Sequence, residues 1–301
     1  MSSGETHLAM PWNQLLLECN AADGDALSDL LAEAGAEAVT LLDAADQPIF
    51  EPALGTTPLW DRTRINGLFS ADADMDGVVA ELARRLAPTP LPPYRIERLE
   101  DQDWNRAWMD RFQPMRFGER LWIVPSWHAP ADPQAVNILL DPGMAFGTGT
   151  HATTRLCLEW LDSHAPMGKR VIDYGCGSGI LAIAAARLGA TTVWATDNDP
   201  QALLATRENA ERNAVSEVLV TTSPEQAPVE PADVLIANIL AGPLMILAER
   251  FAALVRPGGD VVLSGILHEQ AEEVRTVYQQ WFDMAPATVL EDWVRLEGRR
   301  R

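Results

Sequence analysis

The stretch Arg170-Val171-Ile172-Asp173-Tyr174-Gly175-Cys176-Gly177-Ser178-Gly179-Ile180-Leu181 decides the fold of this 301-residue chain. Two β-branched residues lead into an acidic residue and three glycines at alternate positions, and an apolar, alanine-rich segment follows from Ile180 to Leu188. This order predicts a strand, a tight turn and a helix. Glycines let the backbone approach a ligand closely, and the first N–H groups of the helix face whatever is bound. The stretch therefore predicts a loop that binds a nucleotide-type ligand.

Strands and helices alternate along the chain after this loop. Asp199 is suited to cap a helix that begins at Pro200, and another helix opens at Pro243. We interpret Val255 to Asp260 as a turn and 268–281 as a helix. The seven predicted strands begin at Val171 and continue at 192–196, 218–222, 233–237, 261–265, 288–290 and 294–296. This alternation predicts an α/β fold with a doubly wound seven-stranded sheet that helices cover on both faces.

The residues that precede the loop complete the same predicted domain, 114–301. Arg120 to Val124 and Val136 to Leu140 have the composition of strands, and Thr153 to Ser163 that of a helix. Asp141 to His151 is rich in glycine and other small residues, so it has too little side-chain mass for a core element. We expect a loop there.

Residues 11–98 consist of two similar halves. One predicted helix runs from Asp25 to Ala34 and ends at Gly35, and another is capped by Asp74 or Asp76. The strands are expected at 12–19, 38–42, 59–69 and 94–99, and Gln47–Phe50 can extend the second of them. The order β-α-β-β-α-β is that of a small ferredoxin-like α+β domain, assigned to 1–98. Because this domain has no catalytic constellation, we expect it to have a binding or packing role.

A connecting helix is predicted at 99–113, between the two domains. Trp104, Trp108 and Phe112 recur at intervals of four, and Asp101 or Asp103 can cap the helix. We expect this aromatic stripe to pack against one of the domains, and the helix to set how the domains face each other.

The net charge is −20, from 43 acidic and 23 basic residues. Residues 1–98 alone hold 16 Asp or Glu against 6 Arg. This balance disfavours direct binding to nucleic acid and favours a basic partner. The N-terminus has no export signal, no apolar run could span a membrane, and the three cysteines lack metal-ligand spacing. We therefore expect a cytoplasmic protein with free thiols, no metal and no membrane contact.

The glycine spacing distinguishes two ligand classes. A dinucleotide loop has the pattern G-x-G-x-x-G, whereas this chain has Asp-x-Gly-x-Gly-x-Gly from Asp173 to Gly179. Asp197 follows Gly175 by 22 residues, at the end of the second predicted strand, where a carboxylate can accept hydrogen bonds from both ribose hydroxyls. The spacing resembles the first motif of class I S-adenosylmethionine-dependent methyltransferases.

Three longer strings narrow this resemblance. Asp141 to Thr154 (DPGMAFGTGTHATT), Val171 to Gly189 (VIDYGCGSGILAIAAARLG) and Asn238 to Pro243 (NILAGP) resemble motifs of the bacterial ribosomal protein L-eleven (L11) methyltransferase family. Asp103 to Phe117 and the strand after it resemble the same family. The resemblance covers essentially the whole chain. It implies transfer of methyl groups from S-adenosyl-L-methionine to the N-terminal α-amine and lysine side chains of a basic ribosomal protein, free or ribosome-bound, which the N-terminal domain would hold. Apart from the resemblance, we expect a monomer.

The resemblance also implies the site residues. Cofactor contacts are expected from Thr154, Asp173, Gly175, Gly177, Gly179, Asp197 and Asn238. Phe146 and Thr148 lie in the loop expected to border the methyl group and the incoming amine, and together with Asn238 they are the candidate catalytic residues. No metal is implied. For His151 we favour a structural role near a helix start over that of a general base.

Two other readings of the sequence stay open at this point. Methyltransferases that modify a glutamine side chain or a nucleobase amine usually carry Asn-Pro-Pro-Tyr after the fourth strand, whereas this chain has Asn238-Ile239-Leu240-Ala241. A non-catalytic cofactor-binding or ribosome-assembly module is the other alternative. The presence of Gly175, Asp197 and Asn238 together argues against it.

Overall fold

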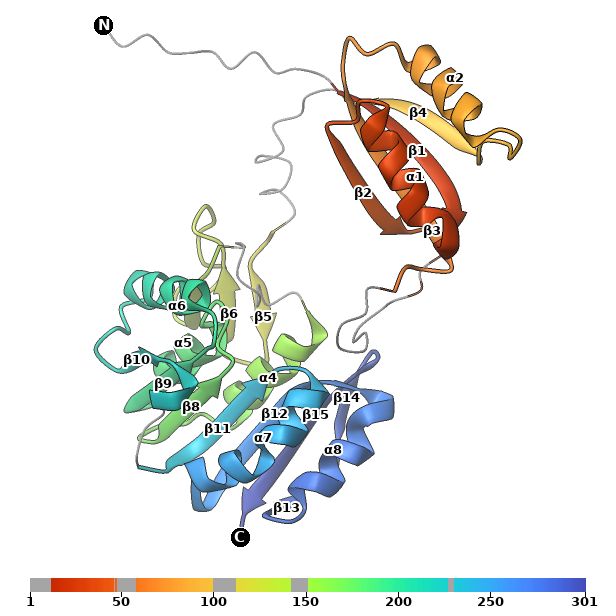
Figure 1. Cartoon of the computed structure of the whole chain (residues 1–301). Helices are drawn as coiled ribbons and strands as arrows, with labels where there is room; N and C mark the ends of the chain where they lie inside the picture. Colours follow the sequence, from red (N-terminus) through yellow and green to blue (C-terminus); the bar gives the residue numbers. More distant parts are fainter. Residues whose placement is uncertain (1–11, 46, 48–57, 100–111, 142–150, 227–229) are drawn as a thin grey trace, which may run out of the picture. The chain divides into compact units, whose positions relative to one another are not determined.

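A computed structural model of the chain describes residues 12–45, 47, 58–99, 112–141, 151–226 and 230–301. The chain forms two compact units, Met1–Met109 and Asp110–Arg301 (Figure 1). Residues 100–111 of the predicted connecting helix, the Gln47–Phe50 extension beyond Gln47, and the loop with Phe146 and Thr148 lie outside the described residues. No helix in the described ranges has the length and apolar character needed to cross a membrane.

The first unit has the predicted ferredoxin-like order of elements. Its sheet has the strand order β2-β3-β1-β4, and every neighbouring pair is antiparallel. The elements are β1 (Trp12–Asn20), α1 (Ala21–Glu33), β2 (Ala38–Asp43), β3 (Arg62–Ser70), α2 (Met75–Leu86) and β4 (Tyr94–Leu99). The prediction that α1 starts at Asp25 is wrong, because the helix follows β1 directly and takes in the small residues from Ala21. Asp74 caps α2, since its carboxylate accepts a hydrogen bond from the Gly77 N–H.

Both helices of the first unit cover the same face of its sheet. The apolar core joins Leu27 and Leu31 of α1 to Leu82 of α2, and the strands contribute Leu15, Leu17, Ile65 and Phe69 from alternate positions. Side chains at the intervening positions belong to the opposite face. There Glu18 pairs with Arg62 and Arg64 of β3. One face of this sheet is thus apolar and covered, and the other carries ion pairs.

The second unit begins with a small sheet of three strands, β5-β6-β7. These are β5 (Met115–Phe117), β6 (Leu121–Val124) and β7 (Val136–Leu139), and α4 (Ala152–Ser163) follows. β5 is not predicted from the sequence, because it has only three residues. α4 begins one residue before the predicted Thr153 and ends at the predicted Ser163.

The large sheet of the second unit contains eight strands, in the order β10-β9-β8-β11-β12-β15-β13, with β14 paired to β15. The first five strands of this path run parallel, and β15 is antiparallel to β12 and β13. The strands are β8 (Arg170–Tyr174), β9 (Thr192–Thr196), β10 (Leu219–Thr222), β11 (Ala232–Asn238), β12 (Val255–Leu267), β13 (Phe282–Met284), β14 (Thr288–Leu290) and β15 (Trp293–Arg300). In the described part of this unit, five helices belong to the layer architecture: α4, α5 (Ile180–Arg187), α6 (Pro200–Arg212), α7 (Ala241–Leu254) and α8 (Ala271–Tyr278).

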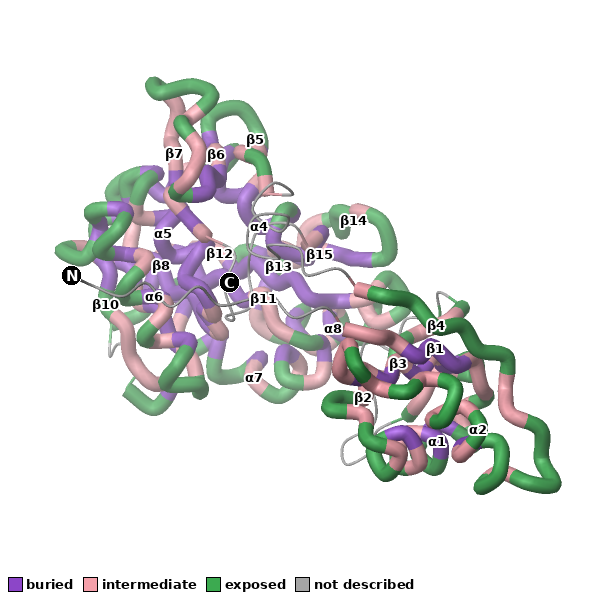
Figure 2. The backbone as a smooth tube through the Cα atoms, turned by 90° about the horizontal axis from the view of Figure 1, so that it is seen from above, coloured by how far each residue is buried: buried purple, intermediate pink, exposed green. Residues whose placement is uncertain are grey.

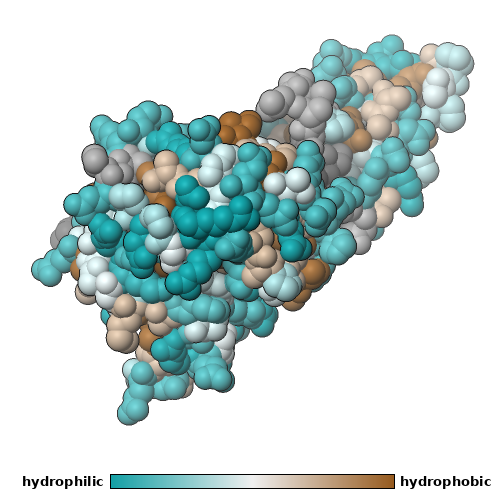
Figure 3. Space-filling model, turned by 90° about the horizontal axis from the view of Figure 1, so that it is seen from below, coloured by the Kyte–Doolittle hydropathy of each residue, from teal (hydrophilic) through white to brown (hydrophobic). Residues whose placement is uncertain are grey.

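Helices cover both faces of this sheet, as the alternation of elements predicts. One core cluster joins α4 and α5 to Val171, Val193 and Ile236, and the other joins α7 and α8 to Ile172 and Leu235. Successive residues of a strand point to opposite faces, which is why both clusters draw on the same strands. Figure 2 shows the buried backbone concentrated along these strands. The side of the molecule seen in Figure 3 is mostly hydrophilic, and hydrophobic side chains occur there in small separate groups.

Three predicted boundaries of the second unit are wrong. The expected turn at Val255 to Asp260 lies within β12, whose register against β11 shifts between Ala232 and Val234, so the extra residues form an irregularity in the strand. The helix expected at 268–281 is a short 3-10 turn followed by α8, which ends at Tyr278. The remaining residues lead into β13, an eighth strand that was not predicted and that takes the edge position beside β15.

Candidate active site

The candidate site lies at the carboxyl ends of β8, β9 and β11. β8 stands at the middle of the parallel part of the sheet, with β9 on one side and β11 on the other. The chain moves outward from β8 to β9 and β10, and then returns to the other side of β8 for β11 and β12. Such a reversal of strand order opens a crevice at the carboxyl ends of the strands, where α/β proteins bind their ligands.

The glycine loop between β8 and α5 is held close to this edge. The N–H groups of Gly175 and Cys176 both donate to the carbonyl oxygen of Thr196, the last residue of β9, at 2.8 and 3.0 Å. Gly175 has φ +80°, and a Cβ at this position would lie 2.4 Å from Cγ2 of Ile239. A side chain here would be strained in its backbone and would also collide with the residue after β11. Only glycine fits this first turn.

Asp173 is the most unusual side chain of the site. It is 1 % exposed; its Oδ2 accepts the N–H of Ala182 in the first turn of α5 at 2.9 Å, while its Oδ1 has no hydrogen-bond partner among the described residues. Burial raises the pKa of the Asp173 carboxyl to about 7, the bond from Ala182 lowers it, and the negative charge of Asp197 raises it. A buried oxygen without a partner costs stability unless a ligand supplies a donor.

Asp197 binds the glycine loop itself. Its Oδ2 accepts the N–H of Gly177 at 2.9 Å, and its Oδ1 accepts the N–H of Asp199 at 3.0 Å. Each carboxylate oxygen has a second lone pair, so the half-buried Asp197 can still accept hydrogen bonds from a ligand. Capping of α6 falls to Asp199, whose carboxylate accepts the N–H of Gln201 at 2.8 Å. This division between the two aspartates is the one that the sequence predicts.

Asn238 and Thr154 meet across the site. The Asn238 side chain leaves the end of β11 and donates from Nδ2 to Oγ1 of the buried Thr154 of α4 at 3.2 Å. Ser264, beside Asn238 in the register of β12, donates to the carbonyl oxygen of Thr153 at 3.1 Å. Two polar bonds therefore tie the start of α4 to the carboxyl ends of β11 and β12, and the first of them fixes the amide of Asn238.

The residues on either side of 142–150 are anchored. Before it, Asp141 accepts the N–H of Ser126 at 2.7 Å and pairs with Arg212 of α6 at 2.9 Å. After it, His151 caps α4, with Nδ1 2.8 Å from Oγ1 of Thr153, and its ring stands edge-on to Trp293. Burial lowers the pKa of the His151 imidazole. The helix-start role expected for His151 is confirmed.

The structure thus brings most of the predicted site residues together. Asp173, Gly175, Gly177 and Asp197 lie at the ends of β8 and β9, where Gly177 donates to Asp197 and Gly175 donates to the carbonyl oxygen of Thr196. Gly179 is the left-handed N-cap of α5. Thr154 and Asn238 form a second pair at the end of β11. Phe146 and Thr148 lie outside the described residues.

Three polar residues behind the loop were missed by the sequence analysis. Thr206 and Asn209 of α6 donate to the carbonyl oxygens of Gly177 and Ser178, and Oγ1 of Thr196 is buried without a partner among the described residues. The sequence holds one signal that these side chains have polar partners. Thr206 and Asn209 are polar residues that lie on the inner side of α6 together with Ala202 and Ala210. Nothing in their spacing points to the glycine loop, which lies about 30 residues earlier in the chain.

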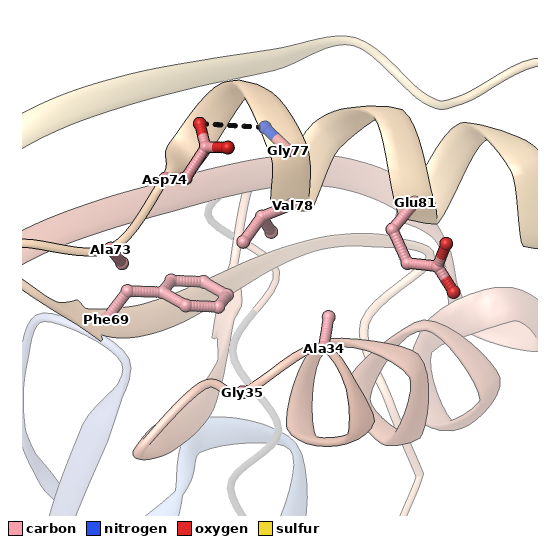
Figure 4. A pocket seen from close by; sticks show the side chains of 8 residues that line it. All are labelled: Ala34, Gly35, Phe69, Ala73, Asp74, Gly77, Val78 and Glu81. Atoms are coloured by element: carbon pink, nitrogen blue, oxygen red, sulfur yellow. Dashed lines mark hydrogen bonds between the residues drawn. The ribbon is translucent and has the colours of Figure 1, made fainter.

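The first unit contains a separate pocket of about 410 Å³ between α1 and α2 (Figure 4). Figure 4 shows the Val78 side chain projecting from α2 toward the Phe69 ring, and the carboxylates of Asp74 and Glu81 on the α2 side. Glu81 pairs with both Arg84 and Arg85. The pocket therefore combines an apolar lining with a polar margin, which holds the Asp74 carboxylate and the arginine-paired Glu81.

Fold and site together define a class I methyltransferase. The sheet has five parallel strands that reverse order at β8, an antiparallel β15 inserted before the edge strand, and a glycine loop followed by an acidic residue after the second strand. These features set the class but leave the acceptor of the methyl group undefined.

Comparison with known proteins identifies the family. Residues 11–301 match the family model described as ribosomal protein L11 methyltransferase (PrmA). The chain is 57% identical over 293 residues to the ribosomal protein L11 methyltransferases of Azotobacter vinelandii and of Pseudomonas aeruginosa strain LESB58, over 97% of this chain and 100% and 99% of theirs. The crystal structure of a ribosomal protein L11 methylase from Lactobacillus delbrueckii subsp. bulgaricus matches with a TM-score of 0.58 and 32% identity, over 63% of this chain and all of that one. The chain belongs to the ribosomal protein L11 methyltransferase family.

Proposed function

We propose that this chain is a cytoplasmic, monomeric enzyme that transfers methyl groups from S-adenosyl-L-methionine to the N-terminal α-amine and lysine side chains of ribosomal protein L11. Membership of the family supports the reaction and the protein substrate. The single observation that carries the cofactor assignment is the buried, unpaired Oδ1 of Asp173 beside the glycine loop.

The residues present suit a cationic, nucleoside-containing cofactor. An amino group that donates to Oδ1 of Asp173 would remove the cost of the unpaired oxygen and favour the ionised carboxylate. Gly175, which leaves no room for a side chain, lets the backbone come close to the ligand. Asp197 keeps acceptor capacity for the two ribose hydroxyls. We therefore assign Asp173, Gly175, Gly177, Gly179 and Asp197 to cofactor binding.

Asn238 is the proposed contact to the incoming amine. Its Nδ2 is engaged by Thr154, which fixes the plane of the amide and leaves the carbonyl oxygen as an acceptor for an N–H of the substrate. Phe146 and Thr148 belong to the proposed wall around the transferred methyl group. When bound, S-adenosylmethionine supplies a methyl group on a sulfonium, an activated leaving group. The protein then mainly has to hold the amine close and in line.

The amine must also lose a proton. A free lysine has a pKa of about 10.4, so presenting it neutral at pH 7 costs roughly 4 to 5 kcal/mol unless the site lowers that pKa. Removal from water at the edge of the sheet acts in this direction. His151 is tied to the start of α4 and packs against Trp293, so we assign it a structural role and expect the proton to pass to water.

The first unit is the proposed binding domain for the ribosomal protein. Its helix side carries the excess of acid: α1 has no basic residue, and the described residues of α1, of α2 and of the turn before α2 hold eight carboxylates against two arginines. On the opposite face Glu18 is neutralised by arginines and Glu97 pairs with Arg95. A basic protein would therefore be attracted to the helix side, which also contains the pocket beside Asp74.

Incubation of the full-length protein with labelled S-adenosylmethionine and purified L11 tests the reaction. We expect label on L11, located by mass spectrometry on the N-terminal amine and on lysines. Asn238→Ala should lower kcat by about a hundredfold, because it removes a contact to the reacting amine. If L11 stays unlabelled while the protein binds S-adenosylhomocysteine, the proposed substrate is wrong.

Charge reversal on α1 tests the binding surface. Asp25 and Asp29 are exposed, and Asp25→Lys/Asp29→Lys should raise KM for L11 about tenfold at low salt, with a smaller effect at high salt. The control Glu217→Lys/Glu249→Lys makes the same change of charge on exposed residues of the second unit. Equal effects of the two double variants on KM would show that only the total charge matters and would reject the helix side as the docking surface.

A further inference from the structure

Helix α6 carries a row of uncharged polar side chains on its inner side. Thr206, Asn209 and Asn213 are spaced by three and four residues, so they share one face of the helix, with Asn213 as its C-cap. Thr206 is 0 % and Asn213 5 % exposed. Buried polar groups are retained at a cost unless they are hydrogen-bonded, so their partners indicate their role.

The first two side chains of this row bind the back of the glycine loop. Oγ1 of Thr206 donates to the carbonyl oxygen of Gly177 at 3.0 Å, and Nδ2 of Asn209 donates to that of Ser178 at 2.9 Å. These are consecutive carbonyls in the loop that the proposed function assigns to the cofactor. Because a peptide unit is planar, holding each carbonyl fixes the direction of the N–H in the same unit. Two side chains of α6 thus hold two successive peptide planes of the loop, and the second plane is also held by the Gly179 N–H, which donates to the carbonyl oxygen of Cys176 at 2.8 Å.

Helix α6 and the glycine loop are closely packed around these two hydrogen bonds. A Cβ on Gly179 would lie 2.8 Å from Cγ2 of Thr206, so the helix and the loop are in direct van der Waals contact at this point. Sγ of Cys176 lies 3.4 Å from the same threonine hydroxyl. On the other side of the loop, Asp197 accepts the N–H of Gly177. The Gly177 residue is therefore held through its N–H by Asp197 and through its carbonyl by Thr206.

The last side chain of the row binds a different strand. Asn213 accepts the N–H of Leu139 on Oδ1 at 2.7 Å and donates from Nδ2 to the carbonyl oxygen of Leu139 at 2.8 Å. The Asn213 amide thus bonds both backbone groups of Leu139, as a neighbouring strand would do at the end of β7. Arg212, one residue earlier, pairs with Asp141. Helix α6 therefore connects the glycine loop to the end of β7.

We propose that Thr206 and Asn209 are positioning residues for cofactor binding, which act by holding the Gly177 and Ser178 peptides in the orientation that the cofactor requires. The inference rests on the proposed function, because it takes the cofactor to bind this loop. Without the two donors the loop has to be ordered when the ligand binds, and the cost of ordering appears as lost affinity. A role limited to packing would lower stability and leave the affinity of the folded protein unchanged.

Paired substitutions at Thr206 separate the hydroxyl from the shape of the side chain. Thr206→Val keeps the shape and removes the donor, whereas Thr206→Ser keeps the donor. Calorimetric titration of the full-length protein with S-adenosylhomocysteine should show Kd raised about tenfold in Thr206→Val and restored to within about twofold of the wild type in Thr206→Ser. Asn209 is only half-buried, so Asn209→Ala provides a second test that perturbs the core less, with the same expected tenfold rise.

The matched control is Glu208→Ala, an exposed position between the two on the same helix, which should leave Kd unchanged. Hydrogen exchange of the ligand-free protein gives a readout independent of binding: amides of 177–179 should exchange faster in Thr206→Val and Asn209→Ala than in Glu208→Ala. Unchanged Kd in both donor-removing variants, with a lowered melting temperature, would overturn the inference. Absence of binding in the wild type would instead overturn the proposed cofactor.

Discussion

The two units of this chain bury polar groups to very different extents. Of the ten polar or charged side chains that are buried among the described residues, only Thr63 belongs to the first unit. The other nine belong to the second unit: Thr153, Thr154, Asp162, Asp173, Ser178, Thr196, Thr206, Asn213 and Ser264. Most of them gather around the carboxyl ends of β8, β9, β11 and β12. Among the described residues, the polar side chains of the first unit lie almost entirely on its surface, whereas the second unit also buries a group of them.

This difference separates two ways of recognising a ligand. Exposed carboxylates on α1 and α2 act through the field of many charges, which salt weakens and which single substitutions change little. Buried groups act one at a time and at close range, and each one without a partner destabilises the empty site. We infer that substrate docking in the first unit is additive and salt-dependent, whereas cofactor binding in the second depends on a few residues that are costly to the free protein.

The sharpest test of this comparison is Asp173. Asp173→Asn keeps the shape and an acceptor for the Ala182 N–H but removes the charge at the proposed cofactor site. We expect Kd for S-adenosylhomocysteine to rise by about a hundredfold, since a hydrogen bond between charged groups is lost in a buried site. Calorimetric titration measures it. An affinity within threefold of the wild type would mean that the unpaired oxygen does not face the ligand.

Asp162 is a buried carboxylate that, unlike Asp173, has hydrogen-bond partners for both of its oxygens. It is 5 % exposed, and its oxygens accept the N–H groups of Glu119 and Arg120 at 2.7 and 3.2 Å. Asp162→Asn places an amide NH₂ against one of these donors, so the free energy of unfolding should fall by about 2 kcal/mol. Urea unfolding measures this loss, and titration of the folded variant should give the Kd of the wild type. A large loss of affinity for S-adenosylhomocysteine would contradict the purely structural role of Asp162.

The pH dependence of stability should reveal Asp173 in the ligand-free protein. Its folded pKa of about 7 lies above the unfolded value near 3.9, so the folded state keeps a proton that the unfolded state releases. Its contribution to stability is complete below pH 4, is lost as the pH rises to about 7, and stays constant above that. At pH 8 Asp173→Asn should therefore be the more stable protein, by on the order of 1 kcal/mol or more.

Urea unfolding of both proteins between pH 4 and 8 gives the difference that isolates this group, because other titrating residues are common to the two. A difference that does not change with pH would show that Asp173 is ionised throughout the range. Cofactor binding should remove the effect, since a cationic donor favours the carboxylate.

The smallest effect is expected on the open face of the first sheet. Glu18 pairs with Arg62 and Arg64, and the three side chains are 42 %, 63 % and 32 % exposed to solvent. These arginines lower the pKa of the Glu18 carboxyl, but solvent screens exposed pairs strongly. Glu18→Gln should leave the urea midpoint and the KM for L11 unchanged within error. A clear rise in KM would move the docking surface from the helix side to the sheet side.

The sequence predicted the site best where local chemistry fixes the backbone. The glycine loop, the Asp199 cap of α6 and the cap of α4 at His151 all depend on residues within a few positions of each other. Prediction failed where long-range pairing decided the outcome. Val255 to Asp260 has the composition of a turn but remains in β12 because β11 pairs with both of its ends. β13 is recognised only through its pairing with β15.

By itself the sequence determined the α/β class, most of the strands along the chain and the position of the glycine loop, because these follow from hydrophobic periodicity and from the conformational freedom of glycine. Tertiary structure decided which distant groups meet: Asn238 with Thr154, the two carbonyls of the loop with Thr206 and Asn209, and Asp173 with no partner for one of its oxygens. Burial and pairing depend on neighbours that lie far apart in the chain, so no local pattern encodes them.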